Sequence, residues 1–288
     1  MHFRIVSPSS TVDIEKVQQA KSQLEQLGHQ VTLSEHVFAQ HRYLAGTIEQ
    51  RVQDLKHACF DSSIDAIWCA RGGTGSAMLL PYLDNWILNK PILGYSDSTS
   101  LLNNIALRGG HALHAPVFQE IASKNLDSSP ISHNALECIS RLSTENSEQY
   151  PITLLNPCIK TQSLKDLPVF GGNLTVLCAL QGTDFQLKLS QPSILMLEDV
   201  GEPYYRIERC LTQLLQSIDT TQLKAVILGD FYNCPQKDVP DSLPDIFNEH
   251  LIPLNIPLFE CDWFGHGLNN RPFWIGKKAT LTDSRLIL

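Results

Sequence analysis

The sequence predicts an α/β protein in which a largely parallel sheet is followed by a mixed α+β region. Its first half alternates short apolar runs with segments whose apolar residues recur every three to five positions, the pattern of stacked βα units. The 288 residues are enough for about two domains of roughly 150 residues each. With 43% hydrophobic and 18% charged residues, the chain can bury a sizeable core, which excludes a disordered protein.

Strands and helices are expected to alternate through the first half. Residues 3–6 form the first predicted strand, and the helix after it ends at Gly28, a typical C′ residue. Thr47 and Gln50 predict a capping box that begins the next helix. The other elements expected in this half are strands at 31–33, 66–70 and 92–95, and helices at 76–83, 101–107 and 134–142.

A second ordered region begins after Pro168, so we place the domain boundary near residue 165, with domains at 1–165 and 166–288. The order of its elements is mixed, which favours an α+β arrangement. We expect a strand at 194–198, a helix at 204–216, a strand at 225–230, and a closing pair of strands at 273–275 and 279–288 joined through Gly276.

Composition also narrows the partners and the location. The net charge of −8 argues against a nucleic-acid partner, and no stretch approaches the roughly 18 apolar residues of a membrane span. Pro8 interrupts the N-terminal apolar run, which lacks the length of a signal peptide, so we expect a cytoplasmic protein.

The eight cysteines are scattered without a C-x-x-C pair, which favours buried free thiols.

Metal motifs are sparse. H-E-x-x-H is absent, and His111 and His114 form only an isolated H-x-x-H in a strand-like segment. We therefore predict no metal site and no cofactor.

The strongest local signal for catalysis lies at 91–102, where an apolar strand passes through Gly94 into Ser96 and then directly into a helix. A serine at such a turn projects its hydroxyl above the sheet edge, beside backbone N–H groups that can stabilise an oxyanion. The match to G-x-S-x-G is incomplete, because Ser98 occupies the last glycine position. From this segment alone, helix capping by these serines is the stronger alternative.

A second loop, residues 70–76, follows the preceding strand at the same sheet edge. Its glycines expose successive N–H groups, a feature of anion sites, but it matches neither the dinucleotide fingerprint nor a P-loop. A tight turn without a ligand is an equally good interpretation.

A serine nucleophile needs a base, and the base needs an acid that orients it. Among the ten histidines, His266 is the best candidate because it lies between Gly265 and Gly267, where another segment can approach closely. The spacing leaves four candidate acids open, which are Glu198, Asp199, Glu202 and Glu208. The order serine, acid, histidine is that of α/β-hydrolases.

Several segments together resemble one family, the L,D-carboxypeptidases of the S66 serine peptidases, which includes the microcin C immunity peptidases. They follow the family order over nearly the whole chain, which makes them more specific than any single motif. The matching segments are ARGGTGS (70–76), LLPYLD (79–84), GYSDST (94–99), HAP (114–116), GGNLTVL (171–177), LEDVGEPYYRIERCLTQL (197–214) and GHGLNNRPFWIG (265–276).

The resemblance implies a catalytic triad. Its residues are Ser96 as nucleophile, Glu198 as acid and His266 as base, with Glu202 outside the mechanism. The implied oxyanion hole combines the Asp97 N–H with one from Gly72 or Gly73. Arg71 is a candidate partner for the substrate carboxylate, with bracing of its own loop as the alternative. The family usually has tyrosine where Thr74 stands, so the wall of the substrate pocket differs here.

The resemblance also implies fold and function. We expect a flavodoxin-like or class I amidotransferase-like N-terminal domain and a smaller swivelling-type β/α C-terminal domain, in a homodimer. The implied activity is metal-independent release of terminal D-Ala from muropeptide tetrapeptides in cell-wall recycling, without a cofactor. The alternative is hydrolysis of peptidyl or aminoacyl nucleotides, as in the microcin branch. That branch needs an aromatic side chain to stack on the base, and between Phe118 and Phe170 the chain contains no Trp and only Tyr150.

Overall fold

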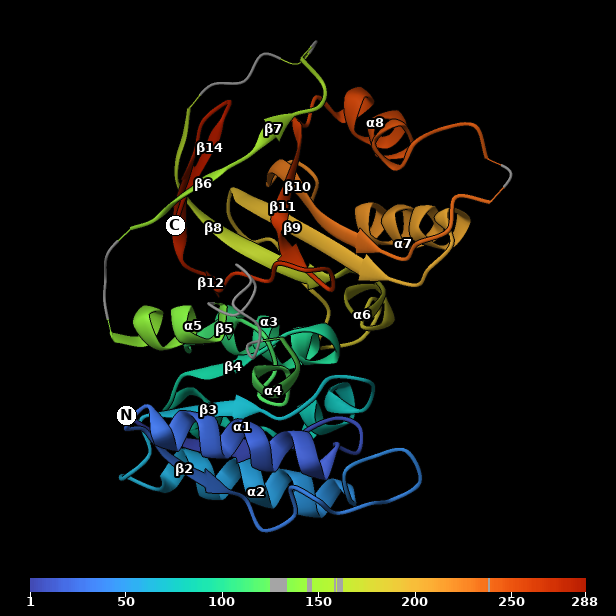
Figure 1. Ribbon diagram of the computed structural model, residues 1–288. Helices are drawn as coiled ribbons and strands as arrows, with labels where there is room; N and C mark the ends of the chain where they lie inside the picture. The colour runs from blue at the N-terminus through green and yellow to red at the C-terminus, as the bar shows by residue number, and fades with distance from the viewer. Residues whose placement is uncertain (125–133, 144–146, 158, 160–162, 238) are drawn as a thin grey trace. The chain divides into compact units, whose positions relative to one another are not determined.

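The computed structural model describes residues 1–124, 134–143, 147–157, 159, 163–237 and 239–288 (Figure 1). The chain forms two compact units. Unit 1 consists of Met1–Thr144 with Arg271–Phe273, and unit 2 of Glu145–Asn270 with Trp274–Leu288. The units thus divide earlier than residue 165, because residues 149–154 already supply two strands to the sheet of unit 2. No helix in the described part of the chain is long and apolar enough to cross a membrane.

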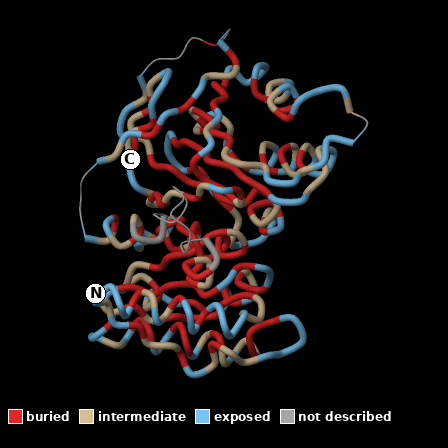
Figure 2. Tube along the Cα trace, viewed as in Figure 1, coloured by how far each residue is buried: buried red, intermediate tan, exposed pale blue. Residues whose placement is uncertain are grey.

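Unit 1 is built on a six-stranded sheet with the order β12-β5-β4-β3-β1-β2. The strands are β1 (His2–Val6), β2 (Gln30–Leu33), β3 (Ala66–Cys69), β4 (Ile92–Gly94), β5 (Ala112–His114) and β12 (Phe273–Ile275). From β2 through β5 every neighbouring pair is parallel. The predicted parallel sheet of the first half is therefore confirmed, and its strands β3, β4 and β5 are fully buried (Figure 2).

The helices of unit 1 include those predicted, together with the short helix α4 and the 3₁₀ turn η2, which were not predicted. They are α1 (Ile14–Gln26), α2 (Ile48–Phe60), α3 (Thr99–Leu107), α4 (Glu120–Lys124) and α5 (Asn134–Ser143), with 3₁₀ turns η1 (Ser76–Tyr82), η2 (Asn85–Leu88) and η3 (Ser96–Ser98). The capping box of α2 is confirmed, since Thr47 and Gln50 exchange side-chain to backbone hydrogen bonds. The α-helix expected at 76–83 is instead a 3₁₀ helix that contains Pro81, whose nitrogen cannot donate a helical hydrogen bond.

Unit 2 contains an eight-stranded sheet with the order β6-β14-β13-β8-β9-β10-β11-β7. Its strands are β6 (Gln149–Pro151), β7 (Thr153–Leu154), β8 (Leu164–Asn173), β9 (Ser193–Val200), β10 (Leu223–Tyr232), β11 (Leu258–Gly265), β13 (Lys278–Leu281) and β14 (Arg285–Ile287). The four central strands, β8 to β11, are parallel, and the flanking strands are antiparallel. The helices are α6 (Leu174–Ala179), α7 (Tyr204–Ser217) and α8 (Leu243–Leu251), with the 3₁₀ turn η5 (Ile252–Leu254).

The predicted closing pair of strands is wrong. β12 lies at the edge of the six-stranded sheet, whereas β13 pairs antiparallel with β8 and with β14. The chain turns at Gly276, which has a φ of 80° and donates its N–H to the Val169 carbonyl at 2.7 Å. This turn starts the pairing of β13 with the long strand β8, so the two strands on either side of Gly276 enter different sheets.

Candidate active site

Ser96 lies in a strained turn between β4 and α3. Its φ is +60°, a region that side chains other than glycine rarely adopt and that is enriched at functional sites. The N-cap positions of η3 and α3 are Tyr95 and Ser98, so Ser96 occupies neither capping position. A Cβ on Gly94 would lie 3.0 Å from the Ser98 hydroxyl, which explains glycine at the start of the turn. The geometry is that of a nucleophile elbow.

The glycine loop after β3 packs directly against this turn. A Cβ built on Gly72 would lie 2.8 Å from Ser96 Cβ, 2.9 Å from its Oγ and 3.6 Å from the Asp97 nitrogen. Gly73 has a φ of 106°, and a side chain there would collide with Ser10. The two loops therefore meet at one sheet edge, as the parallel strand order predicts, and only glycine at position 72 leaves the serine hydroxyl accessible.

Buried polar contacts hold the two loops together. Asp97 accepts the Ser76 N–H at 2.8 Å through Oδ2, and its carbonyl accepts the Ser76 hydroxyl at 2.6 Å. Arg51 of α2, also buried, donates to the Pro8 carbonyl at 2.6 Å and the Gly75 carbonyl at 3.0 Å. Burial lowers the pKa of Arg51, and the Asp97 carboxylate opposes that shift. Sequence reasoning missed Arg51, since nothing in its helical surroundings distinguishes it from a surface arginine.

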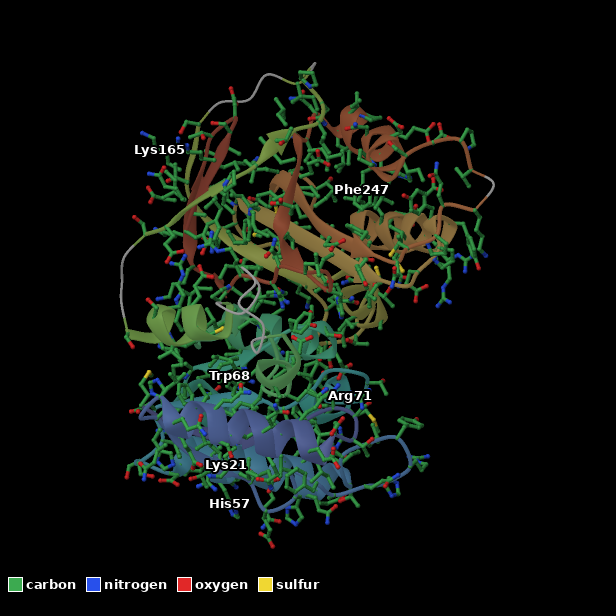
Figure 3. The ribbon with its side chains drawn as sticks, in the orientation of Figure 1. Lys21, His57, Trp68, Arg71, Lys165 and Phe247 are labelled. Atoms are coloured by element: carbon green, nitrogen blue, oxygen red, sulfur yellow. The ribbon has the colours of Figure 1, made fainter. Side chains whose placement is uncertain are left out.

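Arg71, which Figure 3 labels, and Thr74 are the two candidate substrate-binding residues, and both are exposed on this loop. The Arg71 guanidinium donates to the Thr11 carbonyl at 2.6 Å, and the Thr74 N–H donates to Ser10 Oγ at 3.0 Å. Arg71 therefore does brace its loop, which was the structural alternative for this residue.

Unit 2 brings together one acid and one histidine. His266 Nδ1 lies 2.6 Å from Glu198 Oε2, and the two side chains are 15% and 0% exposed. Burial raises the pKa of Glu198, and the nearby His266 opposes the shift. An acid at Nδ1 fixes the imidazole so that Nε2 is directed away from it, as a general base requires.

The other three candidate acids have different partners. Asp199 accepts from Asn173 Nδ2 at 3.1 Å and from both the N–H and the hydroxyl of Thr175, at 2.9 and 2.8 Å, so it anchors the start of α6. Glu202 forms an ion pair with Arg206 at 2.9 Å, and Glu208 Oε1 lies 3.2 Å from His250 Nε2. Glu198 and Asp199, near the end of β9, are both buried.

The glycines that flank His266 are explained by Asp230 at the end of β10. A Cβ on Gly265, whose φ is 128°, would lie 2.8 Å from the Asp230 carbonyl oxygen, and one on Gly267 would collide with the Asp230 carboxylate. Asp230 is the β10 residue that pairs with Gly265. The predicted close approach of another segment is therefore present. Asp230 itself was missed, although its place after an apolar strand and a glycine was a usable signal.

The H-x-x-H pair is split. His111 is exposed, while His114 is fully buried in β5 and stacks on Phe273 with ring centroids 4.6 Å apart. Within the described residues, no three His, Cys, Asp or Glu side chains cluster as metal ligands. Seven cysteines are described and all are free thiols, four buried and three half-buried, while Cys158 lies outside the described residues.

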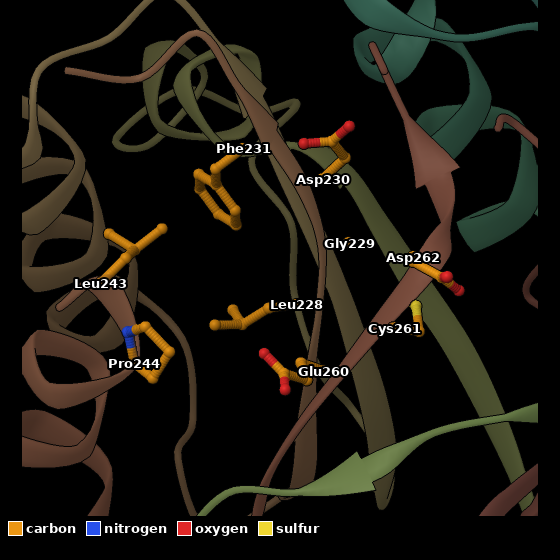
Figure 4. A pocket seen from close by; sticks show the side chains of 9 residues that line it. All are labelled: Leu228, Gly229, Asp230, Phe231, Leu243, Pro244, Glu260, Cys261 and Asp262. Atoms are coloured by element: carbon orange, nitrogen blue, oxygen red, sulfur yellow. The ribbon is translucent and has the colours of Figure 1, made fainter. Parts of the chain in front are cut away.

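A pocket of about 350 Å³ lies between β10, β11 and the start of α8 (Figure 4). Leu228, Phe231 and Leu243 line it with apolar side chains, and Glu260 stands beside them. Neither Glu198 nor His266 lines this pocket, although Asp230 does.

Family models match most of the chain. Residues 3–115 match the LD-carboxypeptidase N-terminal domain, Peptidase_S66, and residues 168–281 match the LD-carboxypeptidase C-terminal domain, Peptidase_S66C. The first match contains the Ser96 turn, and the second contains both Glu198 and His266.

Two curated relatives align over nearly the full length. A murein tetrapeptide carboxypeptidase of Pseudomonas aeruginosa is 40% identical over 290 residues, covering 98% of this chain and 93% of the relative. A probable murein peptide carboxypeptidase of Bacillus subtilis is 28% identical, covering 97% of this chain and 88% of the relative.

Solved structures share the fold. The muramoyltetrapeptide carboxypeptidase from Oxalobacter formigenes superposes with a TM-score of 0.85 at 23% identity, over 100% of this chain and 97% of that one. MccF in complex with glutamyl sulfamoyl guanosine superposes with a TM-score of 0.84 at 19% identity, over 100% and 95% of the two chains.

Proposed function

Because this chain belongs to the LD-carboxypeptidase family, peptidase S66, we propose that it is a serine carboxypeptidase that removes the terminal D-Ala from muropeptide tetrapeptides. The bond cleaved joins the L-centre of diaminopimelate or lysine to D-Ala. The observation that carries the proposal is the contact between His266 and the fully buried Glu198, at the positions that the family resemblance assigns to base and acid.

In the proposed mechanism His266 takes the Ser96 proton while the Ser96 oxygen attacks the scissile carbonyl carbon. Glu198 holds the imidazole and stabilises the imidazolium that forms. The tetrahedral oxyanion is bound by the Asp97 N–H and by one N–H of the Gly72-Gly73 turn, each worth roughly 3 kcal/mol in the transition state.

Collapse of this intermediate transfers the proton from His266 to the leaving nitrogen and releases D-Ala. The acyl group stays on Ser96 as an ester. His266 then activates a water molecule, which hydrolyses the ester and frees the tripeptide. Since the nucleophile belongs to unit 1 and the acid and base to unit 2, we propose that catalysis depends on the two units acting together.

Arg71 is our candidate for binding the free carboxylate of D-Ala. Its Nη1 is occupied by the Thr11 carbonyl, and the guanidinium has further N–H donors for a second partner. Thr74, on the same loop, is our candidate for the pocket wall, where the family's usual tyrosine is replaced by a smaller side chain.

We also infer the metal requirement, the cellular location, the oligomeric state and the fold types of the two units. Three side chains and backbone N–H groups suffice for the mechanism, so we infer a metal-independent enzyme. We further infer cytoplasmic cell-wall recycling, a homodimer, a flavodoxin-like or class I amidotransferase-like unit 1 and a swivelling-type unit 2.

Hydrolysis of aminoacyl or peptidyl nucleotides, as in the microcin branch, is the second candidate. Tyr150 argues against it, because this tyrosine is fully buried in β6 and stacks on Trp263 with ring centroids 4.3 Å apart. It is therefore unavailable to stack on a nucleotide base.

The test is mass-spectrometric analysis of L-Ala-γ-D-Glu-diaminopimelate-D-Ala after incubation with the protein and a chelator, for wild type and Ser96→Ala. We expect loss of one alanine with wild type only. Release that requires added metal would contradict metal independence. No release by wild type, with hydrolysis of an aminoacyl sulfamoyl adenosine instead, would support the second candidate.

A further inference from the structure

Two cysteines that the proposed mechanism does not use lie on neighbouring helices of unit 2. Cys178 lies in α6 and Cys210 in α7, two helices that pack together. The Cys178 thiol donates to the Cys210 carbonyl oxygen at 2.8 Å. Cys178 is 4% exposed, whereas Cys210 is half-buried, so a small solute reaches the pair from the Cys210 side.

The surroundings make the two thiols unequal. The contact between the two side chains raises the pKa of Cys178, as does burial, whereas the same contact lowers the pKa of Cys210 to about 7. The Thr175 hydroxyl adds a second hydrogen bond to Cys210, while burial and the charges of Asp199 and Glu202 oppose the shift. Of the two thiols, Cys210 therefore loses its proton more readily, and its thiolate is the better nucleophile of the pair.

We propose that Cys178 and Cys210 form an oxidation site, at which a peroxide converts the two thiols into an intramolecular disulfide between α6 and α7. The Cys210 thiolate attacks one peroxide oxygen, which breaks the O–O bond and gives a sulfenic acid and hydroxide, protonated to water. Cys178 sulfur then attacks the Cys210 sulfur, forming the S–S bond. The sulfenic hydroxyl leaves and takes up the Cys178 proton as a second water. The site is independent of the proposed function.

The two helices that the disulfide would join both begin near β9, the strand that carries Glu198. The N-cap of α6 is Asn173, which donates to Asp199, the neighbour of Glu198 in β9. Helix α7 begins at Tyr204, shortly after the end of the same strand. A disulfide at this site therefore fixes, relative to each other, the two helices that flank the end of β9.

The first test exposes the full-length reduced protein to hydrogen peroxide, blocks remaining thiols with N-ethylmaleimide, and maps tryptic peptides without reduction. Residues 166–188 and 210–224 form separate tryptic peptides with one cysteine each. We expect them to appear as one cross-linked species, two hydrogens lighter than their sum, that dithiothreitol reverses. A different pairing, or Cys210 oxidised to sulfinic acid while Cys178 remains reduced, would overturn the proposal.

The second test measures alkylation rates at pH 7 and needs no substitution. Cys234 is the internal control, because it is also half-buried and burial raises its pKa to about 11. The lower pKa gives Cys210 a much larger thiolate fraction than Cys234 at pH 7, although a thiolate of lower pKa is a weaker nucleophile. On balance, iodoacetamide should label Cys210 on the order of a hundredfold faster than Cys234. In Cys178→Ala, which removes the thiol donor, labelling of Cys210 at pH 7 should slow. Equal labelling of Cys210 and Cys234 in wild type would contradict the assigned role of Cys210.

Discussion

The turn of unit 1 that carries Ser96, the proposed nucleophile, and the Glu198–His266 pair of unit 2, the proposed acid and base, are constructed in different ways. The turn is local, because strand, glycine, Ser96 and helix follow within a few residues and a second glycine loop packs against them. The pair is non-local, because His266 and Glu198 lie 68 residues apart and meet only when β9 and β11 take their places in the sheet. Backbone shape therefore specifies the first region, and burial specifies the second.

Removal of the nucleophile should have the largest effect. Ser96→Ala is expected to lower kcat by up to about a million-fold, the loss seen when a triad serine is removed. Ser98→Ala is the matched control, since this serine lies in the same turn but is fully buried, and it should keep most of the activity. Rates of D-Ala release check both variants. Near-normal turnover by Ser96→Ala would refute the nucleophile assignment.

Replacement of the acid tests the non-local region. Glu198→Gln keeps the shape of the side chain but removes the charge that orients and stabilises His266, so kcat should fall by about ten-thousand-fold. Glu202→Gln, a few residues along the chain, breaks only an ion pair with Arg206 and should change kcat less than tenfold. Equal losses in the two variants would show that the buried pair has no special role.

A methyl group at Gly72 tests the role of backbone shape in the local region. The new Cβ would lie 2.8 Å from Ser96 Cβ, so Gly72→Ala must displace the serine or the loop. We expect kcat to fall by about a hundred- to a thousand-fold, comparable to loss of an oxyanion donor. Gly182→Ala, where a Cβ meets nothing within 4 Å, should leave kcat unchanged. An active Gly72→Ala enzyme would mean that the loop has room to shift.

The variant Asp199→Ala tests whether Asp199, next to Glu198 in β9, stabilises the folded protein. Asp199→Ala would leave the Thr175 and Asn173 donors unsatisfied, and should lower the free energy of unfolding by about 1–3 kcal/mol. Urea unfolding measures this loss. Asp219→Ala is the control, because the exposed Asp219 accepts only local hydrogen bonds from Thr221, and its loss should be smaller. Unfolding of the two variants at the same urea concentration would contradict the anchoring role of Asp199.

The smallest expected effect concerns pH. Burial raises the pKa of Glu198 in the folded protein above 4.5, its ordinary value, so the folded state holds this proton more tightly than the unfolded state. Its contribution to stability is therefore complete below pH 4.5 and is lost as the pH rises through the folded pKa. Glutamine does not titrate, so Glu198→Gln does not lose this contribution as the pH rises. The unfolding free energy of the variant minus that of wild type should therefore increase between pH 4.5 and the folded-state pKa of Glu198. Urea titrations at successive pH values measure the difference, and parallel curves would refute it.

The local region was the easier one to predict from sequence. The spacing of Gly94, Ser96 and the following helix encodes the turn, and the order of parallel strands encodes its meeting with the Gly72 loop. Periodicity likewise predicted β1 to β4 and the helices α1, α2, α3 and α5, because each βα unit is specified by neighbouring residues, whereas the short elements β5 and α4 were not among the predicted elements.

The non-local region could not be derived from spacing. Glu198, Asp199 and Glu202 stand within five residues, and their different roles come from burial and from partners such as Thr175 and Arg206. The family resemblance, and not the pattern, selected Glu198. The expected hairpin at Gly276 failed for the same reason, since adjacency in sequence does not reveal that the following strand has a better partner in β8.

Near its end the chain returns to unit 1 for three residues, Arg271–Phe273, and this affects how the protein is synthesised. β12 begins at Phe273, so the sheet of unit 1 receives its edge strand only after nearly the whole chain has left the ribosome. Until then β5 is an uncovered edge with unpaired backbone groups, the kind of surface on which nascent chains aggregate. A fragment that stops at residue 144 would keep that edge permanently, which makes separate expression of the nucleophile unit a poor strategy.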